Sequence, residues 1–338
     1  MEFVFVLVAL LLCSIVILVA LVVFSAAACI FGASFSVVFR YGLWLLVLPP
    51  LFILYGWLIG RERCVVKEVE IVSPDIPAEF NGYRIVHISD LHLRSFRHRP
   101  YSLAKVVLKI NECNPDAVMF TGDLVTSHPD EIAPLADMLG RIQTKDGVYS
   151  VMGNHDYCPY NRWESPTQQA EAVAAVREQE RALGWTLLDN SNVTLRRGRG
   201  KISLIGVENI SAMRQFSSRG DLGKAMKGAD ADFKILLSHD PTFWRQGVFG
   251  RTDIDLTLSG HTHNAQLKLF GWEPSRLMFK ENSGLYSEQP QAGQRQYLYV
   301  NDGIGETMFP ARIGVPAEVT LITLRGPVSD KQRLGLPR

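Results

Sequence analysis

The sequence predicts an α/β protein with a separate apolar segment at its N-terminus. Short apolar strands alternate with amphipathic helices up to residue 182, and further strands without long helices follow. Such an order favours a mixed sheet or two sheets. Ahead of these elements, residues 3–39 and 41–60 contain no charged side chain. The 338 residues suffice for one large domain in addition to that segment.

Each element of the expected domain is identified from its apolar spacing and from the residues that end it. Alternation with a period of two predicts strands, and spacing of three and four predicts helices. The helix that begins at Pro100 ends before Asn114-Pro115, and a long polar helix from Ser165-Pro166 ends before Gly184. In chain order we expect strands 65–71 and 83–90, helix 100–113, strand 117–121, helix 132–142, strand 148–152, helix 165–182, and strands 202–207, 233–237, 254–258, 296–300 and 317–324.

These elements divide the chain into three parts: a membrane anchor over residues 1–62, one soluble domain over 63–326 and a tail over 327–338. The net charge is only +1, so the charge balance does not favour nucleic acid as a partner. The five cysteines are odd in number, scattered and without metal-finger spacing. This pattern argues against a disulfide framework and favours a reducing compartment.

The apolar N-terminus predicts two transmembrane helices, over about residues 3–28 and 41–60. Each stretch reaches the roughly 20 apolar residues that span a bilayer. A cleaved signal peptide is the weaker alternative, because no basic segment precedes the run and a second apolar run follows it. Pro49-Pro50 would kink the second helix or turn it into a re-entrant hairpin, so multi-pass and single-pass arrangements both stay open.

Basic residues predict which side of the membrane the domain occupies. Arg61, Arg63 and Lys67 follow the second apolar run, whereas the loop between the runs offers only Arg40. Because positive residues favour the cytoplasmic side, we expect the domain on the cytoplasmic face of the cell (inner) membrane. The bilayer is then one expected partner.

Five of the expected strands end in oxygen or imidazole side chains, and no cysteine is among them. Ligands of α/β sheets collect at the carboxyl ends of strands, so these side chains can converge. Oxygen and imidazole ligands suit a pair of divalent metal ions. The candidate ligands are Asp90, His92, Asp123, Asn154, His239, His261 and His263.

We expect the seven ligands to form two metal sites that share Asp123. This aspartate follows Gly122, where the backbone can turn sharply and free the carboxylate to bridge two ions. Two ions roughly 3.5–4 Å apart can activate a bridging water and hold a phosphoryl group for in-line attack. The first site takes Asp90, His92 and His263, and the second takes Asn154, His239 and His261.

His155 and Asp156 follow the ligand Asn154 directly and are the candidate catalytic residues. Protonation of a leaving oxygen requires an acid whose pKa lies near neutrality, which suits the His155 imidazole. Asp156 could orient that imidazole or tune its pKa. Other histidines, such as His87 and His128, are interpreted as structural.

The ordered set of strand-end motifs resembles that of the calcineurin-like metallophosphoesterase superfamily. The resemblance covers nearly all of residues 83–324 and implies a four-layer α/β/β/α sandwich. It also implies a dinuclear centre of manganese, iron or zinc and hydrolysis of a phosphate ester or anhydride. The matching motifs are Asp90-x-His92, Gly122-Asp123, Gly153-Asn154-His155-Asp156, Ser238-His239 and Gly260-His261-x-His263.

Two further stretches narrow the resemblance within that superfamily. The second motif lacks the arginine typical of protein phosphatases, which disfavours a protein substrate. The C-terminal stretch 297–318 is similar to the bacterial membrane-associated branch typified by the YkuE and YaeI proteins. Some relatives there cleave the pyrophosphate of UDP-2,3-diacylglucosamine in lipid A synthesis. Asn264-Ala265-Gln266 departs from the Gly-Gly-Gln of many relatives, so the substrate of those relatives is not carried over to this chain.

The substrate is expected to carry phosphate, and a lipid-linked phosphodiester or pyrophosphate leads because the site would lie beside a bilayer. Arg94 is the candidate substrate contact, and residues 97–99 either clamp a second anionic group or form a solvated loop. Two alternatives stay open. One is a general phosphodiesterase that acts on soluble esters, and the other is a non-catalytic membrane scaffold that metal stabilises.

Overall fold

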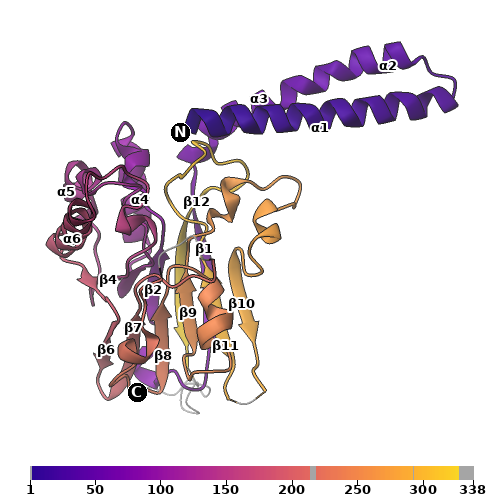
Figure 1. The fold of residues 1–338 in the computed structure, drawn as a ribbon. Coiled ribbons are helices and arrows are strands. Elements are labelled where there is room, and N and C mark those ends of the chain that lie inside the picture. The colour runs from indigo at the N-terminus through magenta and orange to yellow at the C-terminus, as the bar shows by residue number, and fades with distance from the viewer. Residues whose placement is uncertain (1, 214–217, 292, 327–338) are drawn as a thin grey trace.

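Two six-stranded sheets lie face to face, and helices cover their outer faces (Figure 1). This computed structural model describes residues 2–213, 218–291 and 293–326, so the expected tail 327–338 lies outside it. The first sheet has the order β1 (Cys64–Val72), β12 (Ala317–Arg325), β2 (Arg84–Ile88), β3 (Ala117–Phe120), β4 (Val148–Ser150) and β5 (Thr186–Leu187). The second has the order β10 (Gly284–Glu288), β11 (Gln296–Val300), β9 (Leu256–Ser259), β8 (Phe233–Leu237), β7 (Gly200–Gly206) and β6 (Ser191–Arg197).

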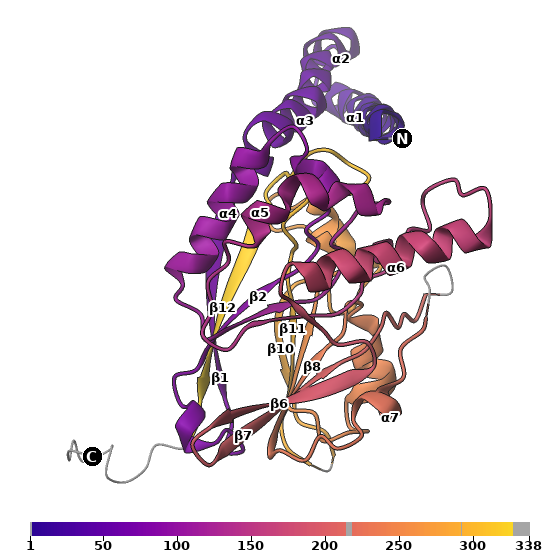
Figure 2. The same ribbon diagram turned by 90° about the vertical axis from the view of Figure 1, so that its left-hand side faces the viewer.

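Three apolar cores hold four layers together. Neighbouring residues of a strand point to opposite faces, so Ile85 faces the other sheet while Val86 faces the helices. The helices on the first sheet are α4 (Pro100–Glu112), α5 (Ala136–Leu139) and α6 (Pro166–Ala182), which face the viewer in Figure 2. On the outer face of the second sheet lie α7 (Leu222–Ala225) and the π-turn Trp244–Val248. The expected α/β/β/α sandwich is confirmed.

Strand direction brings the strand ends with ligands to one edge of the molecule. In the first sheet β2, β3 and β4 are parallel, and in the second sheet β8 and β9 are parallel. Antiparallel pairing of β12 with β2 and of β10 with β11 makes both sheets mixed. Loops that leave the carboxyl ends of parallel strands meet at a common edge, so this topology positions the site.

The helix expected over 132–142 is wrong, and three edge strands, β5, β6 and β10, were not predicted. The helix expected over 132–142 is broken into a 3-10 turn, Ala133–Leu135, and the short α5. Pro134 lies in that turn, and Leu135 has φ −119° and ψ 0°, outside the helical range. Strand β6 was missed because its sequence is largely polar. It is an edge strand with partly exposed faces, so strict apolar alternation is not required.

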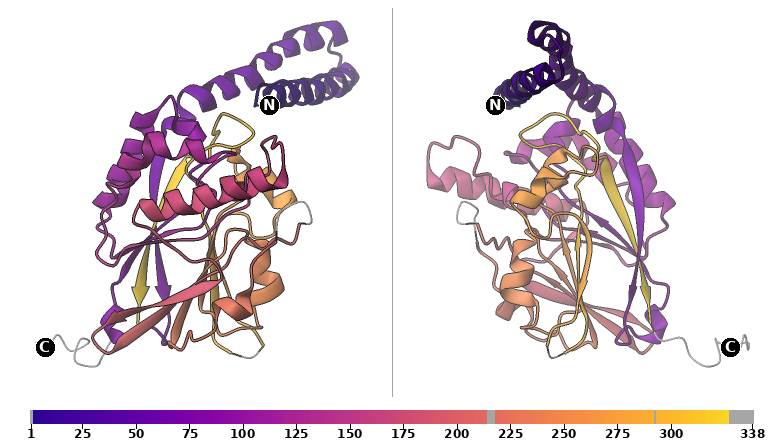
Figure 3. Two further views of the ribbon diagram at one scale, coloured as in Figure 1. Left: turned by 60° about the vertical axis from the view of Figure 1, so that its left-hand side comes forward. Right: turned by 90° about the vertical axis from the view of Figure 1, so that its right-hand side faces the viewer.

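An apolar helical hairpin projects from one end of the sandwich (Figures 1 and 3). Its first arm is α1 (Glu2–Ile30), and its second arm contains α2 (Phe35–Gly42), the 3-10 turn Leu43–Val47 and α3 (Leu48–Leu58). Two helical spans, Val4–Ile30 and Phe35–Glu62, are long and apolar enough to cross a membrane. Pro49-Pro50 lie in the first turn of α3, where a missing backbone N–H costs little.

The hairpin is joined closely to the sandwich at the end of α3. A side chain at Gly60 would overlap the carbonyl group of Arg312, so only glycine permits this approach. Arg99 binds Glu62, which follows the hairpin, at 2.7 Å and Glu306 of the domain at 2.8 Å. The second arm and the sandwich are therefore held by backbone packing and by an ion-pair network.

Candidate metal centre

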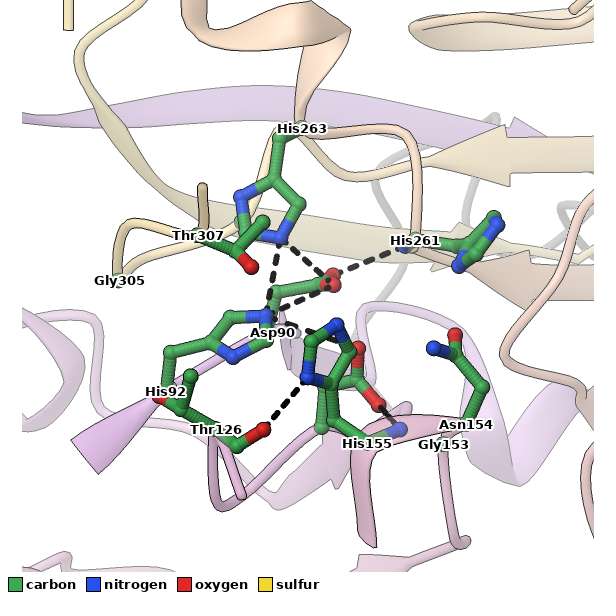
Figure 4. Close-up of polar contacts among 12 residues, drawn as sticks. Asp90, His92, Thr126, Gly153, Asn154, His155, His261, His263, Gly305 and Thr307 are labelled. Carbon is green, nitrogen blue, oxygen red and sulfur yellow. Dashed lines mark hydrogen bonds and ion pairs between the residues drawn. The ribbon is translucent and has the colours of Figure 1, made fainter. Parts of the chain in front are cut away.

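The loops that follow β2, β3, β4, β8 and β9 bring all seven predicted ligands together. Figure 4 labels Asp90, His92, Asn154, His261 and His263 among them. All are buried except His261, which is half-buried. Such burial of carboxylates and imidazoles is costly unless the groups are paired or hold a metal. The clustered residues are Asp90, His92, Asp123, Asn154, His239, His261 and His263.

One group of donors contains Asp90, His92 and His263. The Nε2 atoms of the two histidines lie 3.1 Å apart, and His263 Nε2 lies 3.1 Å from Asp90 Oδ1. The other oxygen of Asp90 accepts the backbone N–H of His261 at 2.9 Å. Asp90 Oδ1 is thus directed at the imidazoles, while Oδ2 connects the loop after β2 to the loop after β9.

A second group contains Asn154, His239 and His261. His239 Nε2 lies 3.1 Å from Asn154 Oδ1 and 3.2 Å from His261 Nδ1. His239 donates its Nδ1–H to the Thr121 carbonyl at 2.7 Å, which directs the Nε2 atom into the cluster. Tyr160 lies 3.4 Å from Asn154 Nδ2 and accepts its N–H, which turns the amide oxygen toward His239.

Asp123 lies between the two groups. Its Oδ2 atom is 3.6 Å from His92 Nε2 and 3.3 Å from His239 Nε2. Its Oδ1 atom accepts the backbone N–H of His155 at 2.8 Å. A side chain on Gly153 would overlap the Asp123 carboxylate, so glycine is required where the loops after β3 and β4 meet. One oxygen of Asp123 therefore faces both donor groups.

Several ligand residues adopt the left-handed backbone conformation. Such a conformation in a residue other than glycine costs of the order of 1–3 kcal/mol and is concentrated at functional sites. Aspartate and histidine tolerate it better than most residues, which is consistent with their use here. The φ angles are 52° for Asp90, 40° for His92, 59° for Asp123, 70° for His261 and 48° for His263.

The electrostatics of the cluster favour bound positive charge. Burial lowers the pKa of the His239 imidazole, but the charges of Asp123 and Asp90 outweigh burial and raise that pKa to about 10. Burial likewise raises the pKa of the Asp90 and Asp123 carboxyls, but the surrounding histidines outweigh it, and both pKa values are lowered. Charged carboxylates among converging imidazole nitrogens fit the ligand set of divalent metal ions.

His155 is oriented by a backbone carbonyl and not by its neighbour Asp156. Its Nδ1–H donates to the Thr126 carbonyl at 2.7 Å. The Asp156 carboxylate instead accepts the backbone N–H groups of Asp123 at 2.8 Å, Gly153 at 2.9 Å and Val125 at 3.1 Å. Asp156 therefore shapes the loops that carry the ligands, and burial followed by the charge of Asp123 raises the pKa of its carboxyl to about 7.

Four residues near the ligands were not identified as site residues from the sequence. Tyr160 contacts the ring of His155, with ring centroids 4.4 Å apart, and Asp240 Oδ2 lies 3.7 Å from His261 Nε2. Arg312 is fully buried, and its Nη2 lies 3.5 Å from His263 Nδ1. Asp240 follows His239 directly and could have been considered. Thr126 acts through its backbone, which no residue pattern reveals.

The predicted substrate contact, Arg94, lies at the margin of the cluster. Its side chain is exposed and lines a pocket of about 470 Å³ together with Arg97 and His98. The same pocket is lined by Thr126 and Thr307, which Figure 4 shows beside the histidine cluster. Arg94 therefore lines a pocket beside the candidate ligands and is not one of them.

Comparison with known proteins identifies the family. Residues 83–265, more than half of the chain, match the family model Calcineurin-like phosphoesterase. The transmembrane protein with metallophosphoesterase domain of Danio rerio is 31% identical over 296 residues, which cover 85% of this chain and 63% of that protein. The uncharacterized metallophosphoesterase YkuE of Bacillus subtilis is 29% identical over 281 residues, which cover 80% of this chain and 90% of that protein.

Among solved structures, a metallophosphoesterase from Sphaerobacter thermophilus is 17% identical and covers 76% of this chain and 96% of its own, with a TM-score of 0.31. The chain spans 63% of the length of the Danio rerio relative. Members of the matched family generally bind two divalent metal ions and act on phosphate-containing substrates. From the matched residues and the ordered strand-end motifs, we conclude that this chain belongs to the calcineurin-like phosphoesterase family.

Proposed function

We propose that this protein is a membrane-anchored, metal-dependent enzyme that hydrolyses a phosphodiester or pyrophosphate bond. The observation that carries the proposal is the position of Asp123 Oδ2 between two groups of ligand donors. His155 lies beside the same carboxylate, so an acid group borders the centre. The family match supports the general reaction class.

The chain's own residues would hold two ions in two groups that share Asp123. Asp90, His92 and His263 would bind one, and Asn154, His239 and His261 the other. When bound, divalent manganese, iron or zinc would activate water and stabilise charge on the phosphoryl oxygens. Because Asn154 is held by Tyr160 and His239 by Thr121, both donors are oriented before any ion binds.

His155 would supply a proton to the leaving oxygen. Its Nδ1–H is engaged by the Thr126 carbonyl, so Nε2 is the atom free to hold and give the transferred proton. Tyr160 packs on one side of the ring and His92 on another, with ring centroids 4.4 Å and 4.7 Å away. These contacts fix the direction of Nε2 and leave that atom available for proton transfer.

We propose that residues 1–62 anchor the domain, residues 63–326, on the cytoplasmic face of the cell membrane. The long apolar side chains of the hairpin are largely exposed, which water would oppose and a bilayer would favour. A side chain at Gly56 of α3 would overlap Ile313 of the domain. Ile313 in turn forms a β-bridge with Leu267, and the segment after Leu267 carries further exposed apolar side chains. These are Phe270, which is 100% exposed, Trp272, Leu277 and Met278.

A lipid-linked phosphate ester or pyrophosphate, such as UDP-2,3-diacylglucosamine, is the substrate class that this location favours. A general phosphodiesterase would act equally well on soluble esters, and a scaffold would bind metal without turnover. The decisive comparison is made with full-length protein in detergent, stripped of metal and then resupplied with manganese. The assays would use bis(p-nitrophenyl) phosphate, a lipid pyrophosphate and a soluble pyrophosphate.

We expect turnover that requires metal and is abolished by Asp123→Ala, with metal content falling in that variant. His155→Ala should keep its bound metal and lose most of its turnover. His128→Ala, which changes a histidine outside the ligand cluster, is the matched control and should resemble the parent. Bound metal without turnover on any substrate would favour the scaffold, and equal turnover on soluble and lipid substrates would favour the general phosphodiesterase.

A further inference from the structure

A basic pocket lies where the hairpin, the loop after β2 and the segment before β12 meet. Its volume is about 470 Å³, within the roughly 300–1,000 Å³ typical of small-molecule sites. Trp57 and Arg61 come from the end of the hairpin, and Glu306 and Pro310 come from the domain. The positively charged or titratable bases that line it are Arg61, Arg94, Arg97, His98 and Arg99.

Some of these positive charges are available to a ligand. Arg99 is engaged by Glu62 and Glu306 and thus neutralises the carboxylate that lines the pocket. In contrast, no ion pair within residues 2–213, 218–291 and 293–326 involves Arg94 or Arg97, and both side chains are exposed. Two arginines that line one pocket without an acidic ion-pair partner among the described residues favour a phosphate group as the ligand.

An apolar pocket of about 280 Å³ continues from the basic one into the hairpin. It is lined by Val6 and Leu10 of α1 and by Ile53 and Leu54 of α3. Trp57 and Pro310 line both pockets, so the two share a wall. The Arg61 guanidinium lies 4.9 Å from the Trp57 ring centroid, at the point where apolar lining gives way to basic lining.

The basic pocket also borders the candidate metal centre. Thr126 and Thr307 line the pocket, and Figure 4 shows them beside His92, His155 and His263. The Thr126 carbonyl accepts the Nδ1–H of His155 at 2.7 Å. An elongated ligand could therefore reach from the metal ligands across the arginines to the hairpin.

We propose that these two pockets form one binding site for a phosphate-bearing membrane lipid. The anionic headgroup lies against Arg94 and Arg97, and one acyl chain lies in the apolar pocket between α1 and α3. This inference rests on the proposed function and deepens it, because it assigns the lipid half of the substrate to named residues. Tryptophan and arginine at the end of α3 suit the headgroup level of a bilayer, where such a lipid would enter sideways.

The test measures binding without turnover. Full-length protein, stripped of metal, is placed in phosphatidylcholine nanodiscs with phosphatidic acid that carries a diazirine in one acyl chain. After illumination, labelled residues are located by mass spectrometry. Diacylglycerol with the same diazirine is the probe control, since it lacks the phosphate. We expect phosphatidic acid to label Val6, Leu10, Ile53 or Leu54, and diacylglycerol to label the hairpin evenly.

Two sets of variants test the two halves of the site. Arg94→Glu with Arg97→Glu should reduce pocket labelling at least about tenfold, since each arginine near an anionic headgroup contributes roughly fivefold in affinity. Ile53→Trp should block the apolar pocket, whereas Val19→Trp, which alters an exposed position further along α1, should not.

Equal labelling by the two probes, or labelling that survives both sets of variants, would overturn the inference. Metal-dependent hydrolysis of bis(p-nitrophenyl) phosphate combined with even labelling would support the proposed reaction and contradict only the lipid site. Pocket labelling without any hydrolysis would support the lipid site and contradict the proposed reaction.

Discussion

Arg99 connects the hairpin to the sandwich, and replacing it tests how firmly the two are joined. Its guanidinium lies 2.7 Å from Glu62 Oε1 and 2.8 Å from Glu306 Oε2. The Glu306 side chain is only 7% exposed, and its side-chain hydrogen bonds among the described residues go to Arg99. Arg99→Ala therefore removes the hydrogen bonds of a buried carboxylate, while Glu62 keeps its bond from Ser102.

Removing one partner of a buried ion pair costs about 3–5 kcal/mol of unfolding free energy. Burial raises the pKa of the Glu306 carboxyl although Arg99 opposes the shift, so without Arg99 the pKa should rise further. A carboxyl whose folded pKa exceeds its unfolded pKa loses stabilising free energy as the pH rises through the folded value. The loss of unfolding free energy caused by Arg99→Ala should consequently be larger at pH 8 than at pH 5.

Thermal unfolding of the full chain in detergent at both pH values measures this deficit. At roughly 2–4 °C per kcal/mol, Arg99→Ala should lower Tm by about 6–20 °C at pH 8. Arg325→Ala is the matched control, because that arginine pairs with Glu70 at the surface and such pairs contribute about 0–1 kcal/mol. Adding Glu306→Gln to Arg99→Ala should restore much of the loss.

Equal Tm losses for Arg99→Ala and Arg325→Ala would refute the reasoning, as would a deficit that does not change between pH 5 and pH 8. Failure of Glu306→Gln to rescue the variant would show that the buried charge is not the cause.

Three further predictions concern stability and metal affinity. Burial raises the pKa of Asp255 to about 7, so Asp255→Asn should match the parent in unfolding free energy near pH 4 and exceed it by roughly 2–4 kcal/mol at pH 8. Chemical denaturation across this range measures the difference, and a constant difference would contradict it. Arg312→Lys should weaken metal binding about 10–100-fold, because the guanidinium holds the segment behind His263, and metal titration by calorimetry checks this. Gly153→Ala should abolish metal binding, because its added methyl group would overlap the Asp123 carboxylate, and retained metal in the purified variant would rule this out.

Much of the fold could be predicted because its strands are apolar on both faces. The strands over residues 84–88 and 233–237 are fully or almost fully buried and appear in the sequence as uninterrupted or nearly uninterrupted apolar runs. Helix α4 was predicted from the spacing of residues that do face the core. Edge strands β5, β6 and β10 were missed, and the helix expected over 132–142 was wrong, because none of these segments is governed by strong apolar periodicity.

The types of ligand at the strand ends were determined by the sequence alone. Aspartate, asparagine and histidine are the side chains that hard or intermediate divalent ions bind, and their place after apolar strands is a local property. The glycine before Asp123 is likewise a feature of the local sequence, and its φ of 97° agrees with a sharp turn there. These properties can be predicted because each depends only on neighbouring residues.

Only the tertiary structure decided how those side chains meet. His92 and His263 lie 171 residues apart in the chain and have Nε2 atoms 3.1 Å apart, which requires the two sheets to stack in one register. The carbonyl that orients His155 belongs to Thr126, 29 residues away, and carries no residue-specific signal. The joined basic and apolar pockets likewise need α1, α3 and the segment near Pro310 together. Contacts between distant segments depend on packing of the whole chain, and periodicity within one segment does not report them.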